Sequence, residues 1–141
     1  MRTNIEAICA AVVLVLASGG AYGCSCSVRE GGLWGSSSPI IFHAKILATQ
    51  LTSEKKDLGE VVTARFEIVE TFRGHPSSIP LLRTISRTSY GTCGILLSAG
   101  DEFIIHTDEE GWALECSGTQ AYHASRDKNL VTKLRKARDQ K

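Results

Sequence analysis

The placement of the cysteines constrains this chain more than any other feature, because it follows directly on an apolar N-terminal stretch. Residues 7–17 form an unbroken apolar run of eleven residues, which is shorter than the roughly 20 residues that a membrane span needs. Residues 21–23 read Ala-Tyr-Gly, with small residues at the two positions that a signal peptidase recognises. We therefore expect residues 1–23 to be a cleaved signal peptide, which makes Cys24 the first residue of the exported chain.

The exported chain would hold four cysteines, Cys24, Cys26, Cys93 and Cys116. An even number of cysteines in a small exported domain predicts a disulfide framework. Cys24 and Cys26 project to the same face of an extended segment, and a bridge between them would close a strained ring. Two long-range pairings remain, and either one would clamp the N-terminus between the other two cysteines.

The rest of residues 24–141 is predicted to form one mainly β domain. Apolar and polar residues alternate in 40–47 and 62–68, as expected for strands with one buried face. Residues 51–59 are predicted to be a polar turn. Shorter strands are predicted at 81–85, 103–107 and 112–116, the last two joined as a hairpin. Five short strands favour a closed barrel of the OB-fold type.

A C-terminal helix is predicted to begin at a Ser125 cap and to carry an apolar stripe formed by Leu130, Val131, Leu134 and Ala137. Residues 125–141 hold seven Lys and Arg against two Asp, a net charge of +5, whereas residues 24–124 carry −4. Basic residues near a helix C-terminus complement its dipole. Because no aromatic residue is interleaved with these charges, we expect no nucleic-acid partner.

At its new N-terminus the chain resembles the tissue inhibitors of metalloproteinases (TIMPs), a branch of the netrin-like (NTR) domains, in an N-terminal-domain-only form. The resemblance begins with Cys24-Ser25-Cys26-Ser27 directly after the signal peptide and extends over residues 24–141. The further matching segments are Ile41-Phe42-His43-Ala44-Lys45, Phe66-Glu67-Ile68, Phe72-Arg73-Gly74, Cys93-Gly94, Glu102-Phe103-Ile104-Ile105 and Cys116. The additional cysteines of TIMP loops and the C-terminal disulfide domain are absent.

The resemblance implies a fold, a pairing and a mechanism. The fold is an OB-like barrel with a packed C-terminal helix, and the bridges are Cys24–Cys93 and Cys26–Cys116. In TIMPs the free α-amino group and carbonyl of the first cysteine chelate the catalytic zinc of a protease, and the second residue, here Ser25, enters the specificity pocket. The expected protease-binding residues are thus Cys24, Ser25, Cys26 and Ser27, and the expected partner is a zinc metalloprotease of the zincin type.

The chemistry of such a chelate is independently reasonable. An α-amino group has a pKa of about 7.7–8.0, so part of it is a neutral ligand at pH 7 and zinc can displace the remaining proton. A five-membered N,O chelate fits the open position of a catalytic zinc site. The metal belongs to the partner, so we expect no cofactor of the chain's own.

Other classes of function are weaker or remain as alternatives. The four histidines show no metal-ligand spacing and no nucleophile motif is present, so we do not expect an enzyme. Trp34 and Trp112 are interpreted as packing residues. We expect a secreted or periplasmic monomer without a membrane span. The alternative is a non-inhibitory NTR-type binding module of the cell envelope, either free or lipid-anchored at Cys24. Acylation there would leave Cys93 without a disulfide partner.

Overall fold

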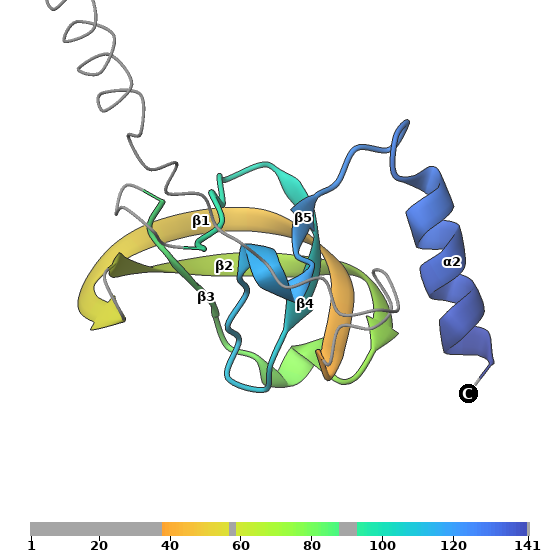
Figure 1. Cartoon of the computed structure of the whole chain (residues 1–141), viewed down its shortest axis with the longest axis horizontal. Helices are drawn as coiled ribbons and strands as arrows, with labels where there is room; N and C mark the ends of the chain where they lie inside the picture. Colours follow the sequence, from red (N-terminus) through yellow and green to blue (C-terminus); the bar gives the residue numbers. More distant parts are fainter. Residues whose placement is uncertain (1–37, 57–58, 88–92, 141) are drawn as a thin grey trace, which may run out of the picture.

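The chain folds into a five-stranded antiparallel sheet with one C-terminal helix, which confirms the mainly β prediction (Figure 1). This computed structural model describes residues 38–56, 59–87 and 93–140. The strand order is β3-β2-β1-β4-β5. The elements are β1 (Ile40–Lys56), β2 (Gly59–Arg73), the 3-10 turn η2 (Pro76–Ser78), β3 (Leu82–Ile85), β4 (Glu102–Thr107), the 3-10 turn η3 (Glu115–Ser117), β5 (Gln120–Ala121) and α2 (Lys128–Asp139).

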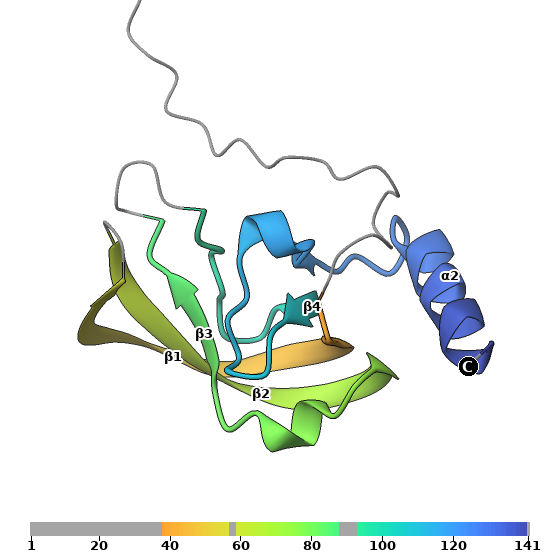
Figure 2. The same ribbon diagram turned by 60° about the horizontal axis from the view of Figure 1, so that its bottom comes forward.

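β1 and β2 form a long curved arm that extends well beyond the predicted strands (Figures 1 and 2). Their pairing runs from Ile41 opposite Arg73 to Lys56 opposite Gly59, so the polar turn predicted at 51–59 is wrong for residues 51–56. Most side chains there are exposed on both faces of the arm, and the apolar alternation that identifies a half-buried strand is therefore missing. The pairing is instead stabilised by the backbone ladder and by a hydrogen bond of 2.9 Å from the Thr52 hydroxyl to the Val61 carbonyl.

The sheet is open, so the predicted closed barrel is not confirmed. The strand predicted at 112–116 is absent: Trp112 forms only an isolated parallel bridge with Arg83 of β3, and η3 follows. The reason lies in the preceding turn, where the Asp108 carboxylate accepts hydrogen bonds from the backbone N–H groups of Glu110 and Trp112. This turn leads the chain toward β3, and β5, which the sequence did not predict, pairs with β4 instead.

The sheet buries apolar side chains on both faces around β1 and β4. On the concave side the rings of Phe42 and Phe66 lie 5.3 Å apart, in a cluster that includes Ala44, Ile46, Leu82, Phe103 and Ile105. On the opposite side Ile41, Phe72 and Ile104 pack against Val131 and Leu134 of α2. Residues 40–43 consequently read as a continuous buried run rather than an alternating one.

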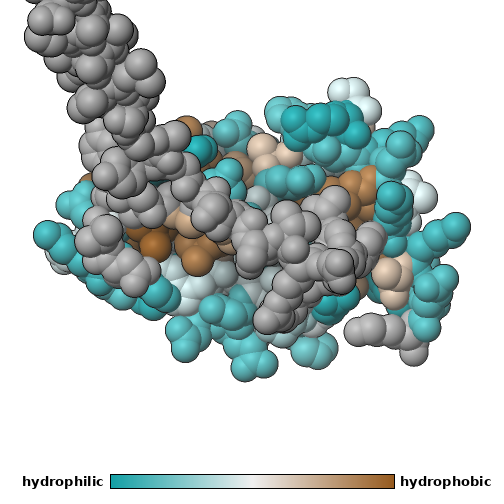
Figure 3. Space-filling model, in the orientation of Figure 1, coloured by the Kyte–Doolittle hydropathy of each residue, from teal (hydrophilic) through white to brown (hydrophobic). Residues whose placement is uncertain are grey.

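Helix α2 lies beside the sheet, at the end away from the tip of the β1–β2 arm (Figure 1). It begins at Lys128 and not at the predicted Ser125 cap, because the Asp127 carboxylate accepts a hydrogen bond of 2.7 Å from the His123 N–H and closes the preceding turn. Its predicted apolar stripe is confirmed at Val131 and Leu134, which are both buried. The outer side of the helix is mostly hydrophilic (Figure 3).

Two arginines of the basic helix serve to dock it. Arg135 contacts the Glu70 carboxylate of β2 at 2.7 Å and Arg138 contacts it at 3.0 Å. Hydrogen bonding from Arg135 lowers the pKa of Glu70, burial opposes this shift, and Arg138 lowers the pKa further. Part of the positive charge of residues 125–141 is therefore used to attach α2 to the sheet.

Replacing Glu70 by Gln should destabilise the protein by about 1 kcal/mol at pH 7, the upper range for partly exposed ion pairs. The pKa of the Glu70 carboxyl is lower in the folded protein than in the unfolded chain. The ion pairs of Glu70 therefore stabilise the fold fully above the pKa of the unfolded chain. This stabilisation is lost as the pH falls through the pKa of the folded protein. Urea unfolding of wild type and Glu70→Gln at pH 7 and pH 3 should show a difference that shrinks in acid. Glu67→Gln, an exposed change on the same strand, is the control, and equal effects of the two variants would contradict the docking role.

Candidate functional site

The predicted protease-binding residues Cys24, Ser25, Cys26 and Ser27 lie outside the described residues, as does Trp34. The zinc chelate and the two disulfides therefore stay predictions. The structure does describe the body to which this N-terminal segment would be attached, including Cys93 and Cys116. Those two positions and their supports form the candidate site.

Cys93 and Cys116 come from distant parts of the sequence and lie close together in the fold. The carbonyl oxygen of Cys93 accepts a hydrogen bond of 3.0 Å from the backbone N–H of Glu115, the residue next to Cys116. Cys93 is half-buried and Cys116, in η3, is exposed. The structure thus brings the two distant cysteines to one place, which is compatible with either of the two long-range pairings.

The Cys93 segment is held firmly against β3. A Cβ atom on Gly94 would lie 1.6 Å from the carbonyl oxygen of Ile85, so only glycine allows this approach. The next residue, Ile95, donates its backbone N–H to the Thr84 hydroxyl at 3.0 Å. Backbone packing and a side-chain hydrogen bond together fix the position of Cys93.

The Cys116 segment is tied to β4 through two hydroxyl groups. The Ser117 hydroxyl lies 2.8 Å from the carbonyl oxygen of His106, and Thr119 bonds both the N–H and the carbonyl of His106 at 2.9 Å. Gly118, with φ of 96°, lies against the His106 ring. η3 is therefore attached to the central sheet, which makes the surroundings of Cys116 rigid.

His106, whose backbone receives these bonds, is buried in its neutral form. It is 1% exposed, and burial, with a smaller contribution from the charge of Arg73, lowers its pKa to about 4. The ring therefore carries no charge near neutral pH. Nothing in the local sequence distinguished His106 from His43, which also lies in an apolar strand.

Cationic side chains lie over Trp112, on the segment that leads to Cys116. The Lys56 ammonium lies 3.6 Å from the centre of the indole ring and the Arg83 guanidinium lies 5.5 Å from it. Trp112 is 7% exposed and packs with Val61 and Ile85. The interpretation of Trp112 as a packing residue is confirmed, and its cation–π contacts link the β1–β2 arm to the candidate site.

The other histidines do not converge. His43 is buried, with its Nε2 atom 2.8 Å from the Glu102 carboxylate and its ring 4.3 Å from that of Tyr122, whereas His75 and His123 are exposed. Within residues 38–56, 59–87 and 93–140, no group of three or more His, Cys, Asp or Glu could hold a metal ion. In the same part of the chain no helix is long and apolar enough to cross a membrane.

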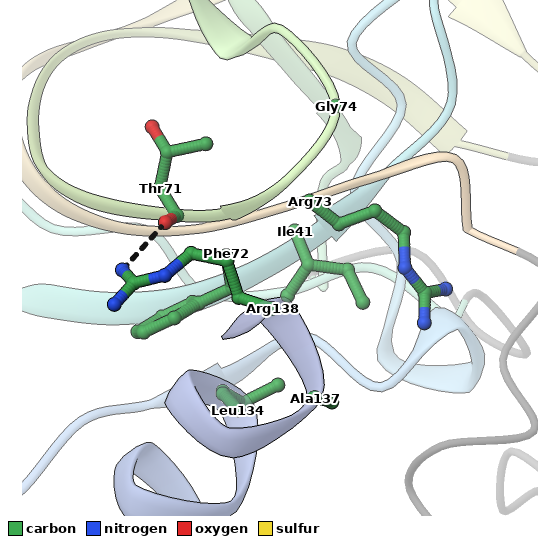
Figure 4. A pocket seen from close by; sticks show the side chains of 8 residues that line it. All are labelled: Ile41, Thr71, Phe72, Arg73, Gly74, Leu134, Ala137 and Arg138. Atoms are coloured by element: carbon green, nitrogen blue, oxygen red, sulfur yellow. Dashed lines mark hydrogen bonds between the residues drawn. The ribbon is translucent and has the colours of Figure 1, made fainter. Parts of the chain in front are cut away.

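A pocket of about 420 Å³ lies between α2 and the sheet, and neither Cys93 nor Cys116 lines it. Its apolar lining comes from Ile41 and Phe72 of the sheet and from Leu134 and Ala137 of α2. The guanidinium groups of two further lining residues, Arg73 and Arg138, lie on opposite sides of these apolar side chains (Figure 4). The sequence predicted the apolar stripe of the helix but not that part of it would line a pocket.

Comparison with known proteins does not assign the chain to a family. No protein-family model matches the chain, and no curated protein matches it. The resemblance to TIMPs therefore rests on the matching sequence segments and the cysteine positions alone.

The buried neutral state of His106 predicts a specific acid sensitivity. A histidine in the unfolded chain binds a proton below about pH 6.5, whereas His106 in the folded protein does so only near pH 4. Stability should therefore fall between these two values by up to about 3 kcal/mol. His106→Gln should flatten this fall in urea unfolding measured at pH 7, 5.5 and 4.5.

The exposed His75 provides the matched control, since His75→Gln should leave the pH dependence as it is in the wild type. An unchanged slope in the His106→Gln protein would show that this residue is not buried in its neutral form.

Proposed function

We propose that this chain is an exported, TIMP-like inhibitor of zinc metalloproteases that acts through its mature N-terminus at Cys24. The observation that carries the proposal is the adjacency of Cys93 and Cys116, joined by the hydrogen bond between Glu115 and Cys93. A Cys-x-Cys segment needs two neighbouring attachment points if both of its cysteines are to be bridged to one body. The closeness of Cys93 and Cys116 supports the proposal because it offers two such points side by side.

In the proposed arrangement Cys24 pairs with Cys93 and Cys26 pairs with Cys116. Each anchor is supported independently, the first by the contact of Gly94 with β3 and the second by the hydroxyl bonds of Ser117 to β4. Anchoring on rigid elements reduces the ordering cost of binding, because little conformational freedom remains to be lost in the complex.

The proposed inhibitory chemistry uses main-chain atoms. The α-amino nitrogen and the carbonyl oxygen of Cys24 would occupy the open position of the protease zinc, where a water molecule otherwise binds. Ser25 would enter the adjacent specificity pocket, and Cys26 and Ser27 would continue along the substrate-binding groove. The protein contributes no metal, only a rigid, unblocked N-terminus.

If the amine is the zinc ligand, one additional alanine ahead of Cys24 should abolish most of the inhibition. The extension converts the primary amine to an amide, which is a poor zinc ligand, and leaves every side chain in place. We expect potency against zincin proteases to fall at least about 100-fold, equal to about 2.7 kcal/mol of binding free energy. Inhibition titrations of both forms against a panel of such proteases measure this.

An alanine added after Lys141 is the matched control, because it changes the length equally and leaves the N-terminus free. Equal potency of the native and N-terminally extended forms would rule out the chelate. Absence of inhibition by every form, with the disulfides intact, would instead support a non-inhibitory binding module.

A further inference from the structure

A small hydrophobic cluster joins the β1–β2 arm to the two cysteine segments. Val61 of β2, Ile85 of β3 and Trp112 are its buried members, and the partly buried Leu114 packs against them. The cluster is distinct from the two that lie on either side of the sheet around β1 and β4. We call these four residues the arm cluster.

Both cysteine segments are supported by the arm cluster. The glycine that follows Cys93 lies against the backbone of Ile85, where an added Cβ atom would approach the carbonyl oxygen to 1.6 Å. On the other segment, Leu114 of the cluster lies two residues before Cys116. The intervening Glu115 donates its backbone N–H to the Cys93 carbonyl at 3.0 Å. A displacement of the arm cluster would therefore reach both cysteines.

The tip of the arm covers this cluster with charged side chains. The Lys56 ammonium lies 3.6 Å from the centre of the Trp112 indole, and the Arg83 guanidinium lies 5.5 Å from it. The same guanidinium is 3.4 Å from the Glu54 carboxylate. Lys56 and Glu54 lie at the end of β1, whereas Trp112 belongs to the segment that leads to Cys116. The arm tip is thus attached to the support of the cysteines.

Among these contacts, the one made by Lys56 is best placed to keep the arm cluster closed. The ion pair of Glu54 and Arg83 joins side chains that are 48% and 37% exposed, and exposed pairs contribute little. The Lys56 ammonium, by contrast, lies well within the range of about 6 Å for a cation–π contact, and its methylene groups can shield the ring from water. Trp112 is only 7% exposed, so loss of this cover would open the cluster to solvent.

We propose that Lys56 is a positioning residue for both cysteine segments and acts on them through Trp112 and the arm cluster. With the ammonium over the indole, the cluster is closed and the backbone around Cys93 and Cys116 is held in one arrangement. Without it, both segments open locally more often. The proposal concerns the rigidity of the two anchors, and only its consequence for inhibition rests on the proposed function.

Amide hydrogen exchange of the full exported chain, followed by mass spectrometry of its peptides, tests the proposal. Lys56→Ala should accelerate exchange in peptides that cover 93–97 and 112–118 by about two- to fivefold, the factor that corresponds to one lost cation–π contact at a partly exposed site. Helix α2 should keep its wild-type rates. Lys56→Arg retains the cation and should restore slow exchange. Lys55→Ala, at the exposed neighbouring position, is the matched control and should have no effect.

Trp112 provides an independent measure of the cover. The chain has two tryptophans, so Trp34→Phe leaves Trp112 as the sole emitter. In this background Lys56→Ala should raise the acrylamide quenching constant, whereas Lys56→Arg and Lys55→Ala should leave it near the wild-type value. Circular dichroism of each variant shows that the fold is retained.

Three outcomes would overturn the proposal. An unchanged quenching constant in Lys56→Ala would show that Lys56 does not cover Trp112. Greater quenching with unchanged exchange in both cysteine segments would show that the arm cluster is not coupled to them. Exchange that rises equally in α2 would show that Lys56 acts on the stability of the whole domain. None of these measurements involves a protease, so failure here would leave the proposed function unaffected.

Discussion

Strand β1 is the element on which the rest of the structure depends, because it pairs with β2 along one edge and with β4 along the other. Its residues also serve both faces of the sheet. Phe42 belongs to the cluster on the concave side, whereas the neighbouring Ile41 packs against α2. A single strand thus joins the two hydrophobic clusters. The segments that follow β3 and β4 in the sequence hydrogen-bond back to these two strands.

This organisation explains why two cysteines so distant in sequence meet. The Cys93 segment is bound to β3 through Thr84, and the Cys116 segment is bound to β4 through His106. Both strands are fixed by the central β1–β2 pair, so the two anchors share its rigidity. For an inhibitor that presents a main-chain amine to a zinc ion, such rigidity is the property that would matter most, because binding then orders little additional chain.

The sequence predicted the parts of the fold in which one face is buried. The apolar stripe of α2 identifies the helix, because burial imposes the period on its residues. The alternation in 62–68 also identifies β2, although within it only Ala64 is fully buried and Ile68 is 38% exposed. The arm at 51–56 carries no such period, since both of its faces are exposed. The turn at Asp108, which removes the strand predicted at 112–116, depends on two side-chain hydrogen bonds that composition does not reveal. At the site, the bridging of the N-terminal cysteines to Cys93 and Cys116 stays a prediction. The burial of His106 required the folded structure.

The central claim is that the N-terminal Cys-x-Cys segment is bridged to the adjacent anchors. Peptide mapping of the non-reduced, exported protein tests it most directly. The account predicts two linked peptide pairs, Cys24–Cys93 and Cys26–Cys116, with an unmodified amine on Cys24. A direct bridge between Cys93 and Cys116, a Cys24–Cys116 peptide or a lipid on Cys24 would contradict it.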